Sequence, residues 1–208
     1  MRMPEVMIAM LLVLLLGQLL QDCVSQSRCP HFGLLLGQRT GSECLGLIGQ
    51  VLPHAPDVGT ALRGLVLNLH LHDRGAALLL SLEGDAAVLS YLIYHQGDGI
   101  DQINDGAMAI TFNILRSLCG PAWLPGEVWF AHRQPEDLAP YRRFFQAPLR
   151  FDREGTALVF PARWLDRALP GADPVRRQEI EQRIAAQGYL DPRDLVGRLR
   201  CALRTLLV

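Results

Sequence analysis

Residues Gly126–Pro170 read GEVWFAHRQPEDLAPYRRFFQAPLRFDREGTALVFPARWLDRALP, and the rest of the chain is interpreted around this stretch. It contains two of the three tryptophans and five of the seven phenylalanines of the protein. Strand-like and helix-like patterns alternate in it every few residues, and no catalytic motif occurs. Such a concentration of large rings predicts a packed junction between strands and helices.

The stretch begins with a predicted strand over 127–132, in which Val128, Phe130 and His132 alternate with Trp129 and Ala131. The pattern does not decide which of these two faces points inward.

After that strand the pattern changes to helical. Acidic residues follow Pro135, which predicts a helix that begins there and ends before Pro148. Short extended segments are expected at 149–151 and 157–160.

The remaining chain supplies a hairpin and further helices. Two apolar runs, 76–83 and 86–94, flank Gly84-Asp85 and predict a β-hairpin. Helices are expected from Asp57 and from Asp101, and two more begin at Asp173-Pro174 and Asp191-Pro192. The helix from Asp101 has an apolar stripe of Ile103, Ala107, Ile110, Ile114 and Leu118, and Asn104, Thr111 and Asn113 are expected mostly on a polar face. The predicted fold class is therefore α+β: a small, mostly antiparallel sheet packed with several helices, followed by a helical C-terminal segment.

The N-terminal segment 1–22 imitates a secretory signal, but Glu5 offsets Arg2 and no cleavage site of small residues follows. Its apolar run from Val6 to Leu16 is shorter than the ~20 residues of a membrane-spanning helix. We expect a buried helix that starts after Pro4, with a signal or anchor as the alternative.

Composition restricts the functional class. The formal net charge of −1 gives no bias toward nucleic acid or anionic membranes. The five cysteines are widely spaced, so reduced thiols in a cytoplasmic protein are expected rather than disulfides or zinc. His70 and His72 point to different faces of a helix, so neither a metal site nor a cofactor is predicted. Glycines between 33 and 49 are expected to allow close helix packing rather than to bind phosphate.

Several segments resemble one family through their order and spacing. They are His31-Phe32-Gly33-Leu34, the Val128–His132 strand followed by Pro135, Tyr141 with FFQAPLRF at 144–151, ALVFP at 157–161, and Trp164-Leu165 with Leu169-Pro170 and Ala172-Asp173-Pro174. From about residue 31 to 207 the chain is similar to the N-terminal effector-binding and dimerisation domain of AraC-type bacterial transcription regulators, in the subgroup called arabinose-binding.

The resemblance implies a function and a division of the chain. Residues 1–170 would form a ligand-sensing α+β domain that includes the N-terminal buried helix, and residues 171–208 a helical pair for dimerisation or linkage. The family's helix-turn-helix domain has no counterpart within 1–208. The sequence thus predicts a cytoplasmic homodimer that binds a small-molecule effector, touches DNA only through that missing domain and does not associate with membranes.

Candidate site residues combine the resemblance with side-chain chemistry. A pocket with apolar walls and few polar groups is expected near the second hairpin strand and the 127–132 strand. The candidates for ligand binding are Tyr91, Tyr94, His95, Trp129, His132 and Arg133, the last as a carboxylate partner. For each of them, core packing with a satisfied polar tip is the competing interpretation. Dimerisation is assigned to the apolar stripe of the last helix, Leu195, Leu199, Leu203 and Leu206.

Two other functions compete with ligand sensing. A ligand-independent homodimerisation module would have a filled core and a large apolar self-interface. A small enzyme would use His132 with Glu136 or Asp137, or Cys119, but no nucleophile-elbow motif supports it.

Overall fold

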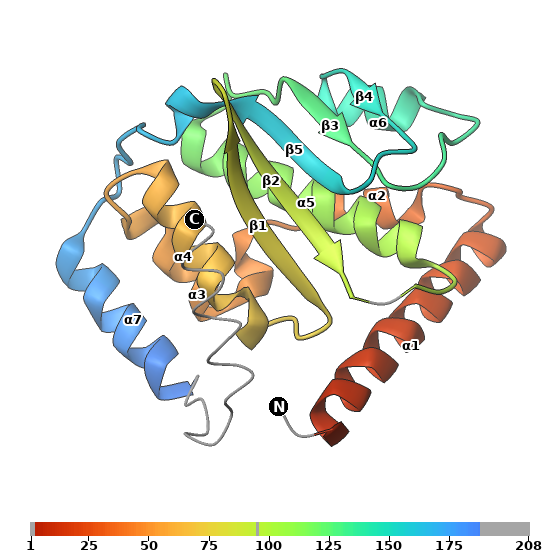
Figure 1. The fold of residues 1–208 in the computed structure, drawn as a ribbon, viewed down its shortest axis with the longest axis horizontal. Helices are drawn as coiled ribbons and strands as arrows, with labels where there is room; N and C mark the ends of the chain where they lie inside the picture. Colours follow the sequence, from red (N-terminus) through yellow and green to blue (C-terminus); the bar gives the residue numbers. More distant parts are fainter. Residues whose placement is uncertain (1–2, 95, 188–208) are drawn as a thin grey trace.

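The computed structural model describes residues 3–94 and 96–187. Figure 1 shows its helices and strands. In chain order they are α1 (Met3–Ser27), α2 (Phe32–Gln38), α3 (Leu47–Val51), α4 (Val58–Asn68), β1 (Ala76–Glu83), β2 (Ala86–Ile93), α5 (Ile100–Cys119), β3 (Glu127–Trp129), α6 (Ala139–Phe145), β4 (Leu149–Arg150), β5 (Thr156–Pro161) and α7 (Pro174–Gln187). Short 3₁₀ helices lie at Ser42–Leu45, Leu52–His54, Leu69–Leu71 and Ala162–Trp164.

The strands form one sheet in the order β1-β2-β5-β3-β4. β1 and β2 are the predicted hairpin, and Gly84 makes its tight turn with a φ of 60°. β2 pairs antiparallel with β5, and β5 pairs antiparallel with β3. Only the two-residue pairing of β4 with β3 is parallel. The predicted α+β class with a mostly antiparallel sheet is confirmed.

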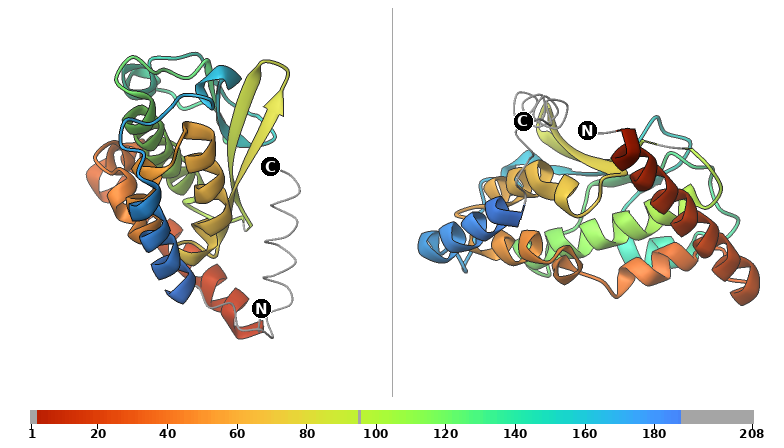
Figure 2. Two further views of the ribbon diagram at one scale, coloured as in Figure 1. Left: turned by 90° about the vertical axis from the view of Figure 1, so that its left-hand side faces the viewer. Right: turned by 90° about the horizontal axis from the view of Figure 1, so that it is seen from below.

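The described helices gather on one face of the sheet, as the two views of Figure 2 show. α5 is the central helix, with β2 and β5 on one side and α2 on the other. Glycines allow the close packing of α2 on α5, as predicted: a Cβ on Gly33 would lie 2.0 Å from the Gln102 carbonyl oxygen, and one on Gly37 would lie 2.4 Å from the Gly106 carbonyl oxygen.

Because α5 is covered on two sides, its buried surface is wider than the sequence indicates. The predicted stripe of Ile103, Ala107, Ile110, Ile114 and Leu118 is only partly buried, and the core also takes Met108, Phe112 and Leu115. Asn104 and Thr111, expected on a polar face, are buried as well, so that expectation was wrong.

The aromatic residues of Gly126–Pro170 form the predicted junction between sheet and helices. Phe130 lies 5.7 Å from Tyr141 and 5.8 Å from Phe145 between ring centroids, and stacks on Phe151 at 5.1 Å. The cluster continues through Phe112, Phe144, Trp123 and Phe160. Val128 and Phe130 therefore mark the inward face of the predicted 127–132 segment, and Trp129 the outward face.

Two boundaries within the stretch differ from the predictions. The strand ends at Trp129 rather than His132, because the chain then turns so that the His132 side chain enters the core. The helix begins at Ala139 rather than Pro135, and the Asp137 side chain accepts a hydrogen bond from the Ala139 amide at 2.8 Å.

The N-terminal helix contradicts the prediction of a buried helix. α1 lies at the edge of the helical layer, and within residues 10–27 only Val13, Gly17 and Leu20 are buried. Within residues 10–27, one stripe of α1 contacts the described fold, through α2, α5 and the start of the hairpin. By length and composition Met10–Ser27 is apolar enough to cross a membrane, and 11% of it is buried.

The C-terminal segment is described through α7. The Asp173 side chain accepts from the Arg176 amide at 2.9 Å and begins this helix, as the Asp-Pro pattern predicts. Ile180 and Ile184 pack on Val51 of α3. The helix predicted from Asp191-Pro192 and its leucine stripe lie outside the described residues, and the proposed division at residue 170 stays a prediction.

Candidate functional site

A cavity of about 520 Å³ opens between α1 and the base of the β1–β2 hairpin. This volume falls in the range of small-molecule sites, about 300–1,000 Å³. The apolar walls come from α1, the 3₁₀ helix Leu69–Leu71, β1, β2 and α5: Leu12, Val13, Leu16, Leu71, Ala76, Ile93 and Ile103. The polar groups are gathered on one side, at His72, Asp73, Arg74 and Tyr91. The cavity therefore suits a molecule that is largely apolar with one polar end.

Asp73 and Tyr91 form the ordered polar contact of this cavity. The Tyr91 hydroxyl donates to Asp73 Oδ2 at 2.9 Å, and the Gly75 amide donates to Asp73 Oδ1 at 2.8 Å. Burial raises the pKa of Tyr91, and the charge and hydrogen bond of Asp73 raise it further. The phenol thus stays a donor at neutral pH. Each carboxylate oxygen keeps accepting capacity for an N–H or O–H group of a bound molecule.

Close backbone contacts place α1 as a wall of the cavity. A Cβ on Gly75 would lie 2.2 Å from Val13 Cγ2, so α1 approaches the start of β1 only because this residue is glycine. At the start of α5, a Cβ on Gly99, whose φ is 75°, would lie 2.0 Å from the Gly17 carbonyl oxygen. These two contacts hold the α1 side of the cavity at both ends.

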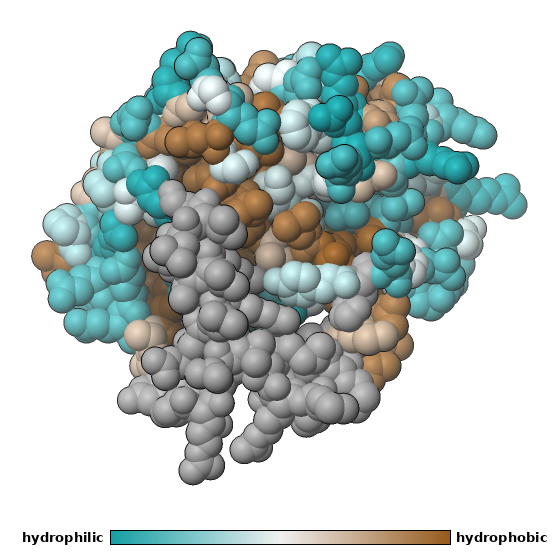
Figure 3. Space-filling view, viewed as in Figure 1, coloured by the Kyte–Doolittle hydropathy of each residue, from teal (hydrophilic) through white to brown (hydrophobic). Residues whose placement is uncertain are grey.

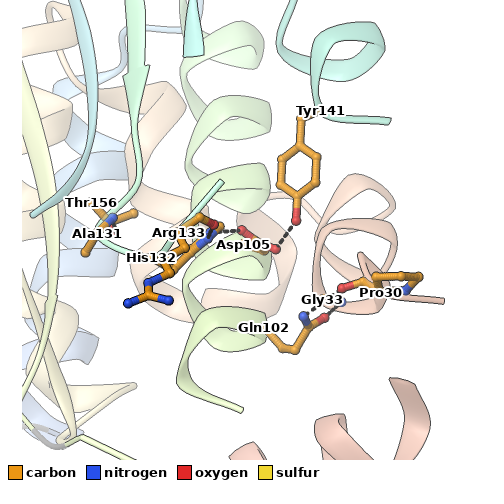
Figure 4. Close-up of polar contacts among 9 residues, drawn as sticks. All are labelled: Pro30, Gly33, Gln102, Asp105, Ala131, His132, Arg133, Tyr141 and Thr156. Carbon is orange, nitrogen blue, oxygen red and sulfur yellow. Dashed lines mark hydrogen bonds and ion pairs between the residues drawn. The ribbon is translucent and has the colours of Figure 1, made fainter. Parts of the chain in front are cut away.

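A second polar cluster is buried in the core (Figure 4). His132 Nε2 lies 2.9 Å from Asp105 Oδ1, and the Tyr141 hydroxyl donates to Asp105 Oδ2 at 2.5 Å. The side chains of His132 and Asp105 are only 5% and 1% exposed. His132 Nδ1 lies 2.8 Å from the Arg133 carbonyl oxygen, which can only accept, so Nδ1 carries a proton.

The protonation state of His132 follows from these partners. Burial lowers its pKa, but the hydrogen bond and charge of Asp105, the Arg133 carbonyl and the charge of Asp101 outweigh burial and raise it overall. A neutral ring with its proton on Nδ1 would point an Nε2 lone pair at a carboxylate. The cluster is therefore an imidazolium–carboxylate pair completed by a phenol, and it has the features of a buried structural network.

Gln102, one turn before Asp105 on α5, holds the junction of α1 and α2. Its Nε2 donates to the Pro30 carbonyl at 2.9 Å, and its Oε1 accepts from the Gly33 amide at 2.8 Å. The same helix therefore carries the buried ion pair and the anchor of the N-terminal helices.

The predicted ligand residues do not converge on one place. Tyr91 lines the cavity, whereas Tyr94 is exposed just after β2. On the other face of the sheet, the Trp129 indole donates to Glu127 at 2.7 Å, and the Arg153 guanidinium lies 4.6 Å from the Trp129 ring. His132 is in the buried cluster, and Arg133 is exposed. His95 lies outside the described residues.

The sequence interpretation did not select Asp73, which follows the HxH pattern, or the α1 leucines. Nor did it select Asp105, although this residue shares a helical face with Gln102, Ala109 and Phe112 at i+3, i+4 and i+3 steps. An acidic residue on such a face indicates a paired buried charge, and that signal was available.

Metal and thiol chemistry have no support among the described residues. No group of three or more His, Cys, Asp or Glu side chains in residues 3–94 and 96–187 could hold a metal ion. Among the described residues, Cys23, Cys29, Cys44 and Cys119 are free thiols. Burial raises the pKa of Cys119 to about 11 against the opposing effect of Arg167, so this thiol is protonated and a poor nucleophile at neutral pH.

Comparisons with known proteins agree with the resemblance found in the sequence. Residues 10–169 match the family described as the arabinose-binding domain of AraC transcription regulators, N-terminal. The chain is 27% identical over 200 residues to the ornithine utilization regulator of Pseudomonas aeruginosa, with 88% of this chain and 55% of that protein covered. The fold is similar to the crystal structure of the transcriptional regulator CdpR from Pseudomonas aeruginosa, with a TM-score of 0.63, 17% identity, and 84% of this chain and 58% of that chain covered.

The chain spans little more than half the length of these relatives. Both are named as regulators, and CdpR is named as a transcriptional regulator. The match over residues 10–169 includes both the sheet and the cavity. The chain therefore belongs to the family of N-terminal arabinose-binding domains of AraC transcription regulators, and it is a ligand-sensing regulatory domain.

Proposed function

We propose that this domain senses a small amphipathic molecule in the cavity between α1 and the hairpin. Through a helix-turn-helix domain outside residues 1–208, the bound molecule would then control DNA binding. The observation that carries the proposal is the 520 Å³ space with apolar walls and a carboxylate held in place at one end. The proposed setting is a homodimer in the cytoplasm without membrane association, with Leu195, Leu199, Leu203 and Leu206 as the predicted dimer contacts.

Asp73 restricts the chemistry of the effector. Its two described hydrogen bonds come from neutral donors, Tyr91 and Gly75, and no described cation lies within ion-pair distance of it. An ammonium or other N–H donor on an aliphatic body would pair with this carboxylate and bury its carbon chain against Leu12, Leu16 and Ile103. The name of the ornithine utilization regulator makes a diamino acid a reasonable first probe.

Thermal-shift and calorimetric titration of the protein with ornithine, hexylamine and hexanoate would test the site. We expect saturable binding of at least one amine, and its loss in an Ile93→Trp variant that fills the cavity. Leu82→Trp, at an exposed position away from the cavity, is the matched control. Binding that survives Ile93→Trp, or no binding by any probe and by a wider metabolite screen, would overturn the proposal.

The ligand-independent homodimerisation module is the second candidate. It is favoured by the leucine-rich outer surface of α1, which no described part of the chain covers. It predicts self-association that is unchanged by any ligand, whereas a sensor requires that the ligand distinguishes two states.

A further inference from the structure

Helix α1 carries two apolar stripes on opposite sides. The inward stripe contains Val13, Gly17 and Leu20 and meets the fold. A Cβ on Gly17 would lie 2.4 Å from the Asp98 carbonyl oxygen, so no larger residue fits there without displacing the helix. The inward stripe thus accounts for the docking of α1.

The outward stripe consists of Leu11, Leu12, Leu15 and Leu19. These side chains are between 51% and 64% exposed. At about 100° per residue they cover an arc of roughly 100° centred opposite Gly17. Figure 3 shows apolar, brown residues at the lower right, where α1 lies in Figure 1. An apolar surface of this kind on a regulator is typical of an interaction site.

A membrane does not fit this stripe well. The Met10–Ser27 segment is apolar enough to cross a membrane, but it would place Asp22 inside the bilayer. The uncharged run between Glu5 and Asp22 comprises residues 6–21 and is about 24 Å long as a helix, against a hydrocarbon core of about 30 Å. The run has no Lys or Arg to attract anionic lipids. Spanning a bilayer would also require the inward stripe to leave its contacts with Gly75 and Gly99.

A second copy of the chain fits the stripe better. Leu11, Leu15 and Leu19 form one i±4 ridge, the pattern that interlocks with an identical ridge in the common crossed packing of two helices. A two-fold axis would bring the same apolar patch of each copy together, with no charge buried between Glu5 and Asp22.

The contact area that the outward stripe offers limits the expected stability of the dimer. The four leucines of the outward stripe, each more than half exposed, together present apolar surface on the order of 300 Å². A stable interface needs about 800 Å² from each partner. The helix pair alone would therefore give a concentration-dependent dimer, which Leu35 and Leu36, exposed on the adjacent α2, would strengthen where they join the contact.

We propose that the outward stripe of α1 is a self-association surface, occupied by the same stripe of a second copy. The inference rests on the proposed homodimer and assigns a surface to it, different from the predicted one on the last helix.

Sedimentation equilibrium over a wide concentration range would test the proposal on the full 208-residue chain. We expect a monomer–dimer equilibrium whose dissociation constant rises at least tenfold in a Leu15→Gln, Leu19→Gln double variant. Leu82→Gln on β1, similarly exposed but distant in the fold, would change it less than twofold. Circular dichroism would verify that all variants keep their helix content.

Directed cross-linking gives an independent measurement that does not require the dimer to be weakened. Under mild oxidation, Leu15→Cys should form a disulfide between two copies of residue 15, identified by peptide mapping against the native free thiols.

Three results would overturn the α1 proposal. The first is a dimer whose dissociation constant is unchanged by the stripe variants but rises when Leu199 and Leu203 are substituted. That result would support the homodimer but place its interface on the last helix. Another is a monomer at every concentration, which would remove the homodimer while ligand titration still tests the sensor. The last is a monomer that binds phosphatidylcholine vesicles through Leu15 and Leu19, which would make a membrane the partner.

Discussion

Replacing His132 with phenylalanine removes the cation from the buried Asp105–His132–Tyr141 cluster and keeps a ring of similar size. The Asp105 carboxylate is 1% exposed and, of its partners in the described chain, would retain only the Tyr141 hydroxyl. Loss of one partner of a buried ion pair costs about 3–5 kcal/mol, and no solvent screening reduces this because neither side chain is accessible. We expect the free energy of unfolding to fall by about that amount.

The reasoning makes two further quantitative statements about the same cluster. Tyr141→Phe removes one hydrogen bond to a charged group and should cost about 1.5–3 kcal/mol. The double variant Asp105→Leu, His132→Phe removes both charges and should cost less than the sum of the two single changes, since no unpaired ion remains.

The raised pKa of His132 fixes the direction in which stability should change with pH. Because the pKa of His132 is raised in the folded protein, its contribution to stability is complete below the unfolded value near 6.5. It is lost as the pH rises through the higher folded pKa. Urea unfolding followed by fluorescence between pH 5.5 and 9 should show this decline in the parent protein and not in His132→Phe.

His54→Gln is the matched control, because His54 Nδ1 also bonds a backbone carbonyl, that of Gly171 at 3.1 Å, but has no carboxylate partner in the described chain. The reasoning is refuted if His132→Phe costs less than about 1 kcal/mol, or if its stability keeps the same pH profile as the parent protein.

Other substitutions test local features of the fold. Gly33→Ala should separate α2 from α5 and lower the thermal unfolding midpoint strongly, because the added carbon would lie 2.0 Å from the Gln102 carbonyl oxygen. Gly64→Ala on α4, where nothing lies within 4 Å of the added carbon, should instead stabilise by about 0.5–1 kcal/mol, and equal effects of the two changes would contradict the packing argument. Asp57→Ala removes the cap that accepts from the Thr60 amide at 2.6 Å and should cost about 1 kcal/mol in urea unfolding, whereas Asp57→Asn should cost less.

Local signals in the sequence predicted much of the fold. The hairpin turn at Gly84 and the caps at Asp57 and Asp173 depend on a few neighbouring residues, and the structure contains all three. The start of α6 was missed by four residues, because Pro135 permits a helix start but does not require one.

Burial was predicted less well, because it depends on what surrounds an element. α1 has the more apolar sequence of the two long helices, yet the described chain covers α5 on two sides and α1 on one. Asn104 and Thr111 are buried because α5 is in the middle, a position that a single helical pattern does not reveal.

The candidate site was harder to predict for the same reason. Tyr91 was selected from its strand and does line the cavity. Its partner Asp73 is 18 residues away in sequence, and the opposite wall comes from α1. Only the fold brings these three segments together. The residue types along β2 alone could therefore indicate Tyr91, but neither Asp73 nor the α1 wall.

The position of α1 joins the two proposals. Leu12 and Leu16 line the cavity, and Leu12 also belongs to the outward stripe. A molecule that fills the cavity would press on the same helix that pairs with a second copy, so any shift of α1 changes both contacts. Because linked binding equilibria are reciprocal, a ligand that favours the dimer must bind the dimer more tightly than the monomer, by the same factor. Two buried side chains in residues 10–27 hold α1 weakly enough for such a shift, whereas a fully buried helix, as the sequence alone predicted, would have no room for it.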